Sequence, residues 1–449
     1  MPSSLPSSRR FVVLAALLLG FAQPALAAGE AAPADLVSLA ARAAGGDLDA
    51  ARALRAAGPA GLSALVDAAV PASGRNEGWI EGWSEGRAGA RFAELPFRQA
   101  LDLVCAQVDC HASRLYWHTD FEAARREAER SGKPILSLRL LGRLDEELSC
   151  ANSRFFRLLL YSDPAVSAAL RERVVLHWSS ERPVPKVTVD YGDGRRLVGT
   201  VTGNSVHYLL DARGRLVDAL PGLHAPHRFL AWVEQSARRA SEWAPLSDAE
   251  LLARLRDEHE RAAGALAESL VRELRALGWE EGAARAAWAA AEPAALAVGA
   301  ADRPPTAADA APLALTKSAA ELPVLAALGM PPPAPAPELA VVQLARTGAW
   351  RAALAPESVE LVLARAPARP RTDVEGALER TRESVSEDGL RNEAFLHRRI
   401  HERLAASAAL PDWRAFNAWV YAELFLTPAG DPWLGLAPSE LLSAVQPAS

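Results

Sequence analysis

Residues 115–241 alternate between short apolar runs and helical stretches, and this pattern constrains the fold more than any other feature. The pattern predicts a helix over 121–131, a strand over 135–140, mostly helix over 150–173, a strand over 174–178, hairpins over 186–201 and 206–220, and a helix over 226–241. The two hairpins surround Gly192-Asp193-Gly194 and Asp211-Ala212-Arg213-Gly214, which are typical turn sequences. Strand, helix, strand, antiparallel hairpins and a closing helix predict an α/β sandwich.

Helical patterns dominate on both sides of this unit. Residues 34–70 predict a hairpin of two short helices broken at Gly45-Gly46, and another helix starts near Phe97. After residue 246 we find no strand pattern, only Ala/Leu/Arg-rich helices interrupted by prolines at 304–305 and 331–337. Near the C-terminus, residues 412–426 predict an aromatic helix with one apolar stripe formed by Trp413, Phe416, Val420 and Leu424.

The N-terminal residues indicate export. Arg9 and Arg10 precede an apolar run over 11–21, which is shorter than the roughly 20 residues that a membrane-spanning helix needs. Pro24 and the small residues Ala25-Leu26-Ala27 follow, as at a signal-peptidase site. We expect cleavage before Ala28 and a periplasmic or secreted protein, with no transmembrane helix after cleavage. The alternative is an ordinary apolar N-terminal helix.

The expected fold class is an α/β domain combined with mostly α-helical N- and C-terminal regions. The chain length agrees with this three-part organisation, because 449 residues correspond to about three domains. The predicted divisions are a signal peptide at 1–27, a helical hairpin at 28–72, a linker at 73–95, an α/β domain with its leading helix at 96–245, and a helical domain at 246–449. A net charge of −6 gives no broad basic field, so we expect no nucleic-acid partner.

Residues 115–235 resemble the thioredoxin-like fold of exported proteins. The matching residues are Trp117, Asp120-Phe121, Gly132-Lys133-Pro134, Cys150, Ser162-Asp163-Pro164, Gly214 and Gly222. The segment over 421–436 also looks like the tail of uncharacterised exported bacterial proteins of this kind. The resemblance places Cys150-Ala151-Asn152-Ser153 on the family's Cys-x-x-Cys redox motif. It implies that Cys150 is the attacking cysteine, with Ser153 in place of the resolving one.

The chain departs from the family pattern at two points. Ser153 removes the thiol that would release a mixed disulfide, and Gly203-Asn204-Ser205 stands where such domains have a proline facing the motif. Cys150 follows Ser149, an expected N-cap, so the start of the helix favours a thiolate, and Arg143 and Arg154 are positioned to assist. The alternative for Cys150 is a buried, inert thiol in a degenerate fold.

The other two cysteines, Cys105 and Cys110, are five residues apart. On a continuous helix this gives a rise of about 7.5 Å, which exceeds the Cα separation of up to about 6.8 Å in disulfides. We therefore expect two buried thiols, unless the helix ends between them.

Histidines give a weaker signal for metal binding. His397, His401 and Glu393 share one face of a predicted helix, as in some metal sites, but their sequence context offers no further ligand. Surface or packing roles are the alternative for them, and His224 and His227 are weaker candidates still. Asp190 and Asp193 fit a hairpin turn better than a calcium loop. We expect no cofactor.

Two functions therefore remain open. In the first, Cys150 exchanges disulfides with a protein partner through a mixed disulfide. In the second, the thioredoxin-like domain is a non-catalytic scaffold or protein-interaction module of the cell envelope.

Overall fold

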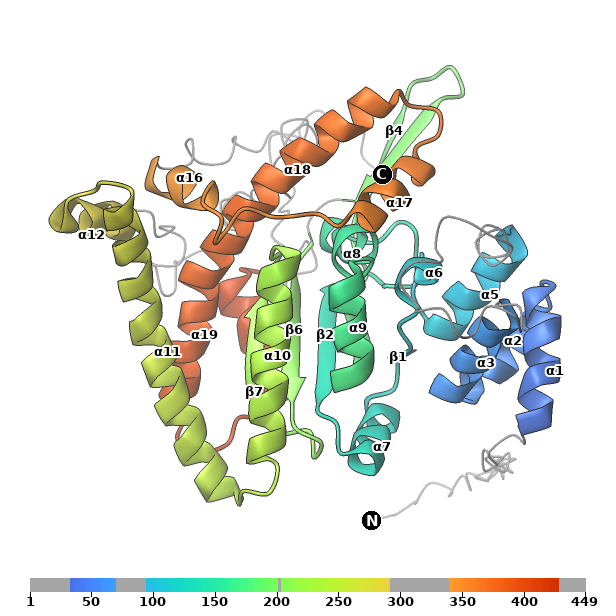
Figure 1. Cartoon of the computed structure of the whole chain (residues 1–449), viewed down its shortest axis with the longest axis horizontal. Coiled ribbons are helices and arrows are strands. Elements are labelled where there is room, and N and C mark those ends of the chain that lie inside the picture. The colour runs from blue at the N-terminus through green and yellow to red at the C-terminus, as the bar shows by residue number, and fades with distance from the viewer. Residues whose placement is uncertain (1–32, 70–93, 201–202, 291–338, 428–449) are drawn as a thin grey trace, which may run out of the picture.

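The computed structural model describes residues 33–69, 94–200, 203–290 and 339–427, in which helices surround one five-stranded sheet (Figure 1). The predicted signal peptide, most of the predicted linker, both proline-rich stretches and the end of the tail lie outside these residues. None of the helices in the described ranges combines the length and the apolar character that crossing a bilayer requires.

The N-terminal unit begins with three helices, not the predicted two: α1 (Pro33–Ala44), α2 (Leu48–Ala56) and α3 (Pro59–Ala69). The predicted break at Gly45-Gly46 is confirmed, and Gly46 has a φ of 99°. A second break occurs at Gly58, whose φ is 72°, and Pro59 then opens α3. A Cβ on Gly61 would lie 2.0 Å from the carbonyl oxygen of Leu54, so α2 and α3 touch through their backbones.

Helix α5 (Leu95–Cys105) packs on these helices, and the short α6 (Cys110–Ser113) follows it. The two are separate because Ala106 and Asp109 have φ angles of 53° and 63°, which end one helix and precede the next. Cys105 and Cys110 therefore approach to a Cα separation of 6.2 Å and form a disulfide. The expectation of two thiols was wrong, since the helix does end between them.

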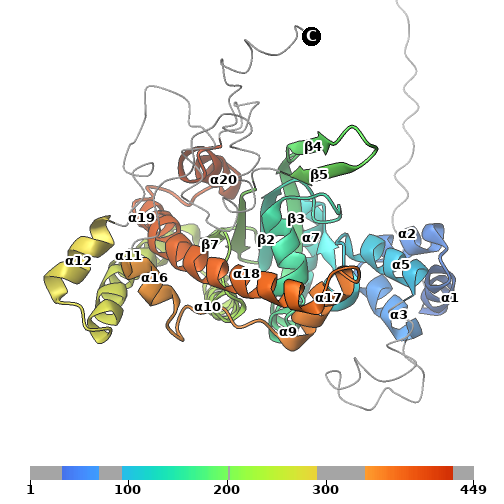
Figure 2. The ribbon, with the colours of Figure 1, turned by 90° about the horizontal axis from the view of Figure 1, so that it is seen from above.

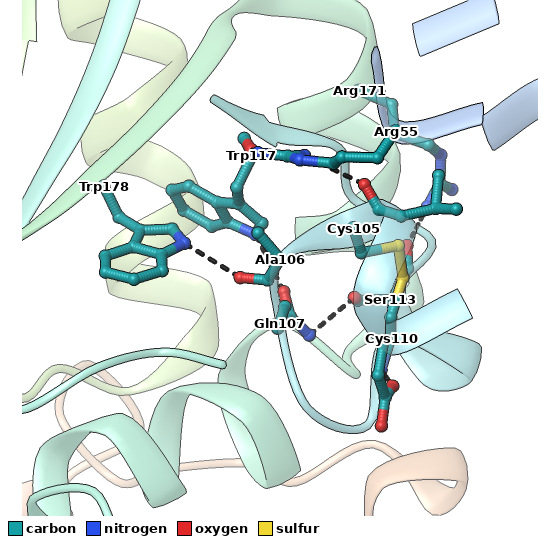
Figure 3. Close-up of a disulfide and its surroundings, with 11 residues drawn as sticks. Arg55, Cys105, Ala106, Gln107, Cys110, Ser113, Trp117, Arg171 and Trp178 are labelled. Atoms are coloured by element: carbon teal, nitrogen blue, oxygen red, sulfur yellow. Dashed lines mark hydrogen bonds between the residues drawn. A yellow bond between two sulfur atoms is a disulfide. The ribbon is translucent and has the colours of Figure 1, made fainter. Parts of the chain in front are cut away.

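The loop closed by this disulfide is anchored to the α/β domain through hydrogen bonds (Figure 3). The indole of Trp178 donates to the carbonyl of Ala106 at 2.8 Å, and that of Trp117 donates to Gln107 at the same distance. Gln107 in turn donates to the hydroxyl of Ser113 at 2.9 Å. The bridge and the sheet therefore form one continuous buried structure.

The central sheet has the strand order β1-β3-β2-β6-β7. Its strands are β1 (Trp117–His118), β2 (Ile135–Leu141), β3 (Val175–Arg182), β6 (Ser205–Leu210) and β7 (Leu216–Pro221). Strands β1, β3 and β2 are parallel, whereas β6 and β7 are antiparallel to their neighbours. Both predicted hairpins form, but β4 (Lys186–Asp190) and β5 (Arg196–Thr200) make a separate two-stranded sheet. The prediction of an α/β unit with flanking helical regions is confirmed at this level.

Helices cover both faces of the sheet. Leu136 and Leu138 of β2 pack in the cluster formed with α9 (Pro164–Arg173) and α10 (Pro226–Trp243). Neighbouring strand residues point to opposite faces, and Ile135 packs in the cluster with α7 (Phe121–Ser131) and the C-terminal helix α20 (Trp413–Trp419). Seen from above, α20 lies on one side of the sheet, and α9 and α10 lie on the other (Figure 2).

In the C-terminal region, the described residues after 246 form helices joined by turns and loops, with no strand among them, as expected. Its elements before α20 are α11 (Asp248–Ala276), α12 (Glu281–Ala290), α16 (Leu339–Ala345), α17 (Pro356–Arg365), α18 (Arg371–Arg391), η4 (Asn392–His397) and α19 (Arg398–Ala405). The π-helical segments are η4, between α18 and α19, and η5 (Val420–Leu424), after α20. The aromatic stripe predicted for the last helix is confirmed, since all four of its side chains are buried.

Candidate functional site

Cys150 lies at the N-terminus of helix α8 (Ala151–Phe155), which continues into the π-helical η2 (Phe156–Leu160). Cys150 is itself the N-cap, in place of the predicted Ser149, and its Sγ accepts the backbone N–H of Ser153 at 3.4 Å. The carbonyl of Ser149 instead accepts a hydrogen bond from the hydroxyl of Thr200 at 3.0 Å. The sulfur therefore has the helix N-terminal position that favours a thiolate.

The thiol of Cys150 is nevertheless closed off from solvent, with an exposed fraction of 0%. Gly203 packs directly on it, because a Cβ there would lie 2.8 Å from the Cβ of Cys150. The C-terminal segment covers the same place: the hydroxyl of Tyr421 donates to the carbonyl of Asn204 at 3.2 Å. Burial raises the pKa of Tyr421 well above its usual value, and the charge of Glu181 raises it further.

The structure also places the residues expected to support catalysis at Cys150. Ser153 is fully buried, and its hydroxyl has no hydrogen-bond partner among the described residues. Arg143 pairs with Asp145 at 2.7 Å and with Glu146 at 3.5 Å, so its charge is largely neutralised. A buried thiolate loses its hydration, which opposes the effect of the helix N-terminus. Among the described residues, the other two cysteines are bonded to each other, so no second thiol lies beside Cys150 to complete an exchange.

A second cluster of polar side chains is buried between the sheet and the C-terminal helices, and Asp218 of β7 lies at its centre. Its carboxylate accepts hydrogen bonds from the indole of Trp232 at 2.9 Å, the hydroxyl of Ser236 at 3.2 Å and the N–H of Ala219 at 2.8 Å. The Nε2 of His397 lies 3.3 Å from the same carboxylate. Asp218 is 1% exposed, so these contacts replace its hydration.

His397 bridges two carboxylates, because its Nδ1 lies 3.1 Å from Glu393. Burial disfavours a charged imidazole, but Glu393 and Asp218 outweigh burial and raise the pKa of His397 to about 10. In return, His397 lowers the pKa of Glu393 to about 2, although burial opposes this. We therefore describe His397 as an imidazolium in a buried ionic triad. The third member of the predicted trio, His401, stays beside His397, with its ring centre 4.0 Å away, but its Nδ1 faces a different histidine.

His401 of α19 faces His259 of α11, and their Nδ1 atoms are 2.7 Å apart. The Nε2 of His259 lies 2.9 Å from the carbonyl of Val217. With Asp218, the two histidines form a group whose potential ligand atoms all lie within 4.8 Å of one another. This group contains His401 from the sequence candidates, together with partners from other elements.

Sequence reasoning missed Asp218 and His259, although both leave a signal. Asp218 is a lone carboxylate within the apolar run Leu216–Pro221, all of whose residues are buried. His259 continues the buried stripe of Leu251 and Leu255 at helical spacing. A polar residue in a buried stripe requires a partner.

The two weaker histidine candidates lie beside backbone carbonyls. His224 is buried with its Nε2 2.9 Å from the carbonyl of Pro221, and burial lowers its pKa to about 4. His227 lies on α10 with its Nε2 3.1 Å from the carbonyl of Ala349. Within the described part of the chain, the hydrogen-bond partners of both are carbonyl oxygens.

A cavity of about 810 Å³ lies where the N-terminal helices meet the α/β domain. Its apolar lining includes Leu62 and Val66 of α3 and Leu170 of α9. Its polar lining includes Arg114 and Arg171; burial and the charge of Arg171 lower the pKa of Arg114 to about 10. None of the residues chosen from the sequence as candidates lines this cavity.

Comparisons with known proteins name no relative for this arrangement. No family model, curated protein or solved structure matches the chain.

Proposed function

We propose that this is an exported protein whose thioredoxin-like domain is a non-catalytic scaffold and protein-interaction module. The support for the fold is the order of its parts. The Gly132-Lys133-Pro134 turn leads into β2, Cys150 opens α8, and Gly203 precedes β6 and faces Cys150. These are the relations that the resemblance implies for a redox motif and the position opposite it.

The burial of Cys150 carries the choice of a scaffold over an oxidoreductase. Thiol–disulfide exchange needs a thiolate that can reach a substrate sulfur. At Cys150 the backbone of Gly203 occupies the space that a substrate sulfur would need. Tyr421 of the C-terminal segment also covers the thiol, through its hydrogen bond to Asn204. A thiol in this position serves as a small core residue.

The Cys105–Cys110 disulfide supports export. Structural disulfides persist in oxidising compartments and are rare where thiols are kept reduced. This bridge is fully buried, and its loop is hydrogen-bonded to the sheet, which is typical of a structural bridge. It agrees with the signal-like N-terminal sequence.

The cavity of about 810 Å³ is our proposed partner site. An apolar wall flanked by charged groups is the setting in which a protein partner inserts an apolar anchor side chain. Glu127 and Lys133 from α7 and the turn after it, together with Arg114, supply charges around the apolar wall. These charges can fix the orientation of the partner chain in the cavity.

Chemical cross-linking in intact cells tests the proposal, with partners identified by mass spectrometry. The variants are Cys150→Ala, Ala168→Trp, which fills the cavity, and Ala165→Trp, an exposed control on the same helix. A scaffold predicts that Cys150→Ala and Ala165→Trp keep the wild-type partners and that Ala168→Trp loses them. Loss of the partners in Cys150→Ala alone would favour thiol exchange.

A further inference from the structure

The structure brings together three potential metal ligands from three elements that are far apart in sequence. Asp218 comes from β7, His259 from α11 and His401 from α19, and their exposed fractions are 1%, 1% and 6%. Their ligand atoms lie within 4.8 Å of one another. Because the cluster is compact and buried, each imidazole nitrogen must either donate a hydrogen bond or present its lone pair to a neighbour.

The hydrogen bonding of His259 shows which nitrogen is available. Its Nε2 faces the carbonyl of Val217 at 2.9 Å, and a carbonyl only accepts, so Nε2 carries the hydrogen. In the neutral ring, Nδ1 then presents its lone pair toward the Nδ1 of His401, 2.7 Å away. Metal-bound histidines typically donate their other ring N–H to a carbonyl or carboxylate in this way.

Hydrogen bonds also fix the carboxylate of Asp218. Trp232 and Ser236 of α10 both donate to its Oδ2, while the N–H of Ala219 donates to Oδ1. These bonds fix the carboxylate and keep an anion beside the two imidazoles. Supporting hydrogen bonds of this kind orient carboxylate ligands.

We propose that Asp218, His259 and His401 bind a divalent transition-metal ion of the zinc class. Two imidazole nitrogens and one carboxylate oxygen form a donor set that suits zinc. The site is buried, and an ion there would join β7 of the sheet to α11 and α19. His397 supports the site through its contact with Asp218. This inference does not depend on the proposed function.

The metal content of the purified protein tests the inference. The full-length chain is expressed for export in medium supplemented with zinc and purified without a polyhistidine tag or chelators. Elemental analysis should then find about one zinc per folded chain. Replacement by Co²⁺ should add the visible absorption of a tetrahedral ion.

The metal content of substituted proteins distinguishes the proposed ligands from a neighbouring buried histidine. His259→Gln and His401→Gln should lose the metal, whereas His224→Gln, a buried histidine that contacts Pro221, should keep it. Because substitution of a buried ligand can prevent folding, wild-type protein is also heated with and without EDTA. A bound ion predicts that the chelator lowers Tm and that added zinc restores it. Folded, zinc-supplemented protein without metal and with a chelator-independent Tm would overturn the proposal and leave an N–H···N bond between the histidines.

Discussion

Replacing Trp413 by alanine should both destabilise the protein and open the cover over Cys150. Trp413 is 5% exposed, and its ring lies 4.9 Å from that of Phe121 and 5.9 Å from that of Tyr208. Truncating a buried tryptophan costs about 3–5 kcal/mol, and aromatic pairs contribute about 0.5–1.5 kcal/mol of interaction each beyond their area. We therefore expect the free energy of unfolding to fall by about 3–5 kcal/mol.

The measurement is urea unfolding followed by circular dichroism, together with labelling of Cys150 by a thiol probe without denaturant. Trp419→Ala is the control, because Trp419 is on the same helix but only partly buried. Trp419→Ala should lower the free energy of unfolding clearly less than Trp413→Ala and should leave the labelling of Cys150 slow. Trp413→Ala should accelerate that labelling. A Trp413→Ala protein within about 1 kcal/mol of wild type, with unchanged labelling, would refute the account of α20 as a packed cover.

Four further predictions concern the N-terminal unit and α11. Burial, the largest effect, raises the pKa of Asp102 from 3.8 to about 7, so stability should fall as pH rises from about 4 to 7 and stay lower above it. Asp102→Asn should therefore be more stable than wild type at pH 8 by about 1–2 kcal/mol after allowance for solvent screening, with little gain at pH 4; equal gains at both would contradict this. Gly61→Ala should cost about 2–3 kcal/mol in thermal unfolding because its Cβ would meet the Leu54 backbone. A Cβ on Gly264 of α11 would meet nothing within 4 Å, so Gly264→Ala should stabilise the protein by about 1 kcal/mol. A Gly264→Ala protein less stable than Gly61→Ala would be inconsistent with the packing. Loss of the Cys105–Cys110 bridge should cost about 2 kcal/mol, from the short loop it closes; identical urea midpoints with and without reductant would argue against it.

Local signals were sufficient for much of the fold. The helix over Phe121–Ser131 matches its prediction at both ends, since Asp120 caps its N-terminus and Gly132 has the positive φ that ends it. Asp163 likewise caps α9 within the Ser-Asp-Pro sequence. These boundaries depend on neighbouring residues, so periodicity and capping chemistry predict them.

Other features depend on backbone conformations or contacts that the sequence pattern does not reveal. Ala106 and Asp109 adopt positive φ without glycine, so the break that permits the disulfide carried no turn signal. The contact between Tyr421 and Asn204 joins residues 217 positions apart, and the His259–His401 pair spans 142 positions. Both long-range contacts follow from how the C-terminal helices dock on the sheet. The candidate sites were therefore only partly predictable.

Thiol labelling of the folded wild-type protein tests the central claim most directly. Disulfide-intact protein is treated with a thiol probe over a range of pH, and modification of Cys150 is followed by mass spectrometry. A scaffold with a closed motif predicts labelling only at the rate of opening or unfolding, accelerated by urea and by Trp413→Ala. Rapid labelling of Cys150 without denaturant, at the rate of an exposed thiolate, would contradict the account and establish the motif as an accessible nucleophile.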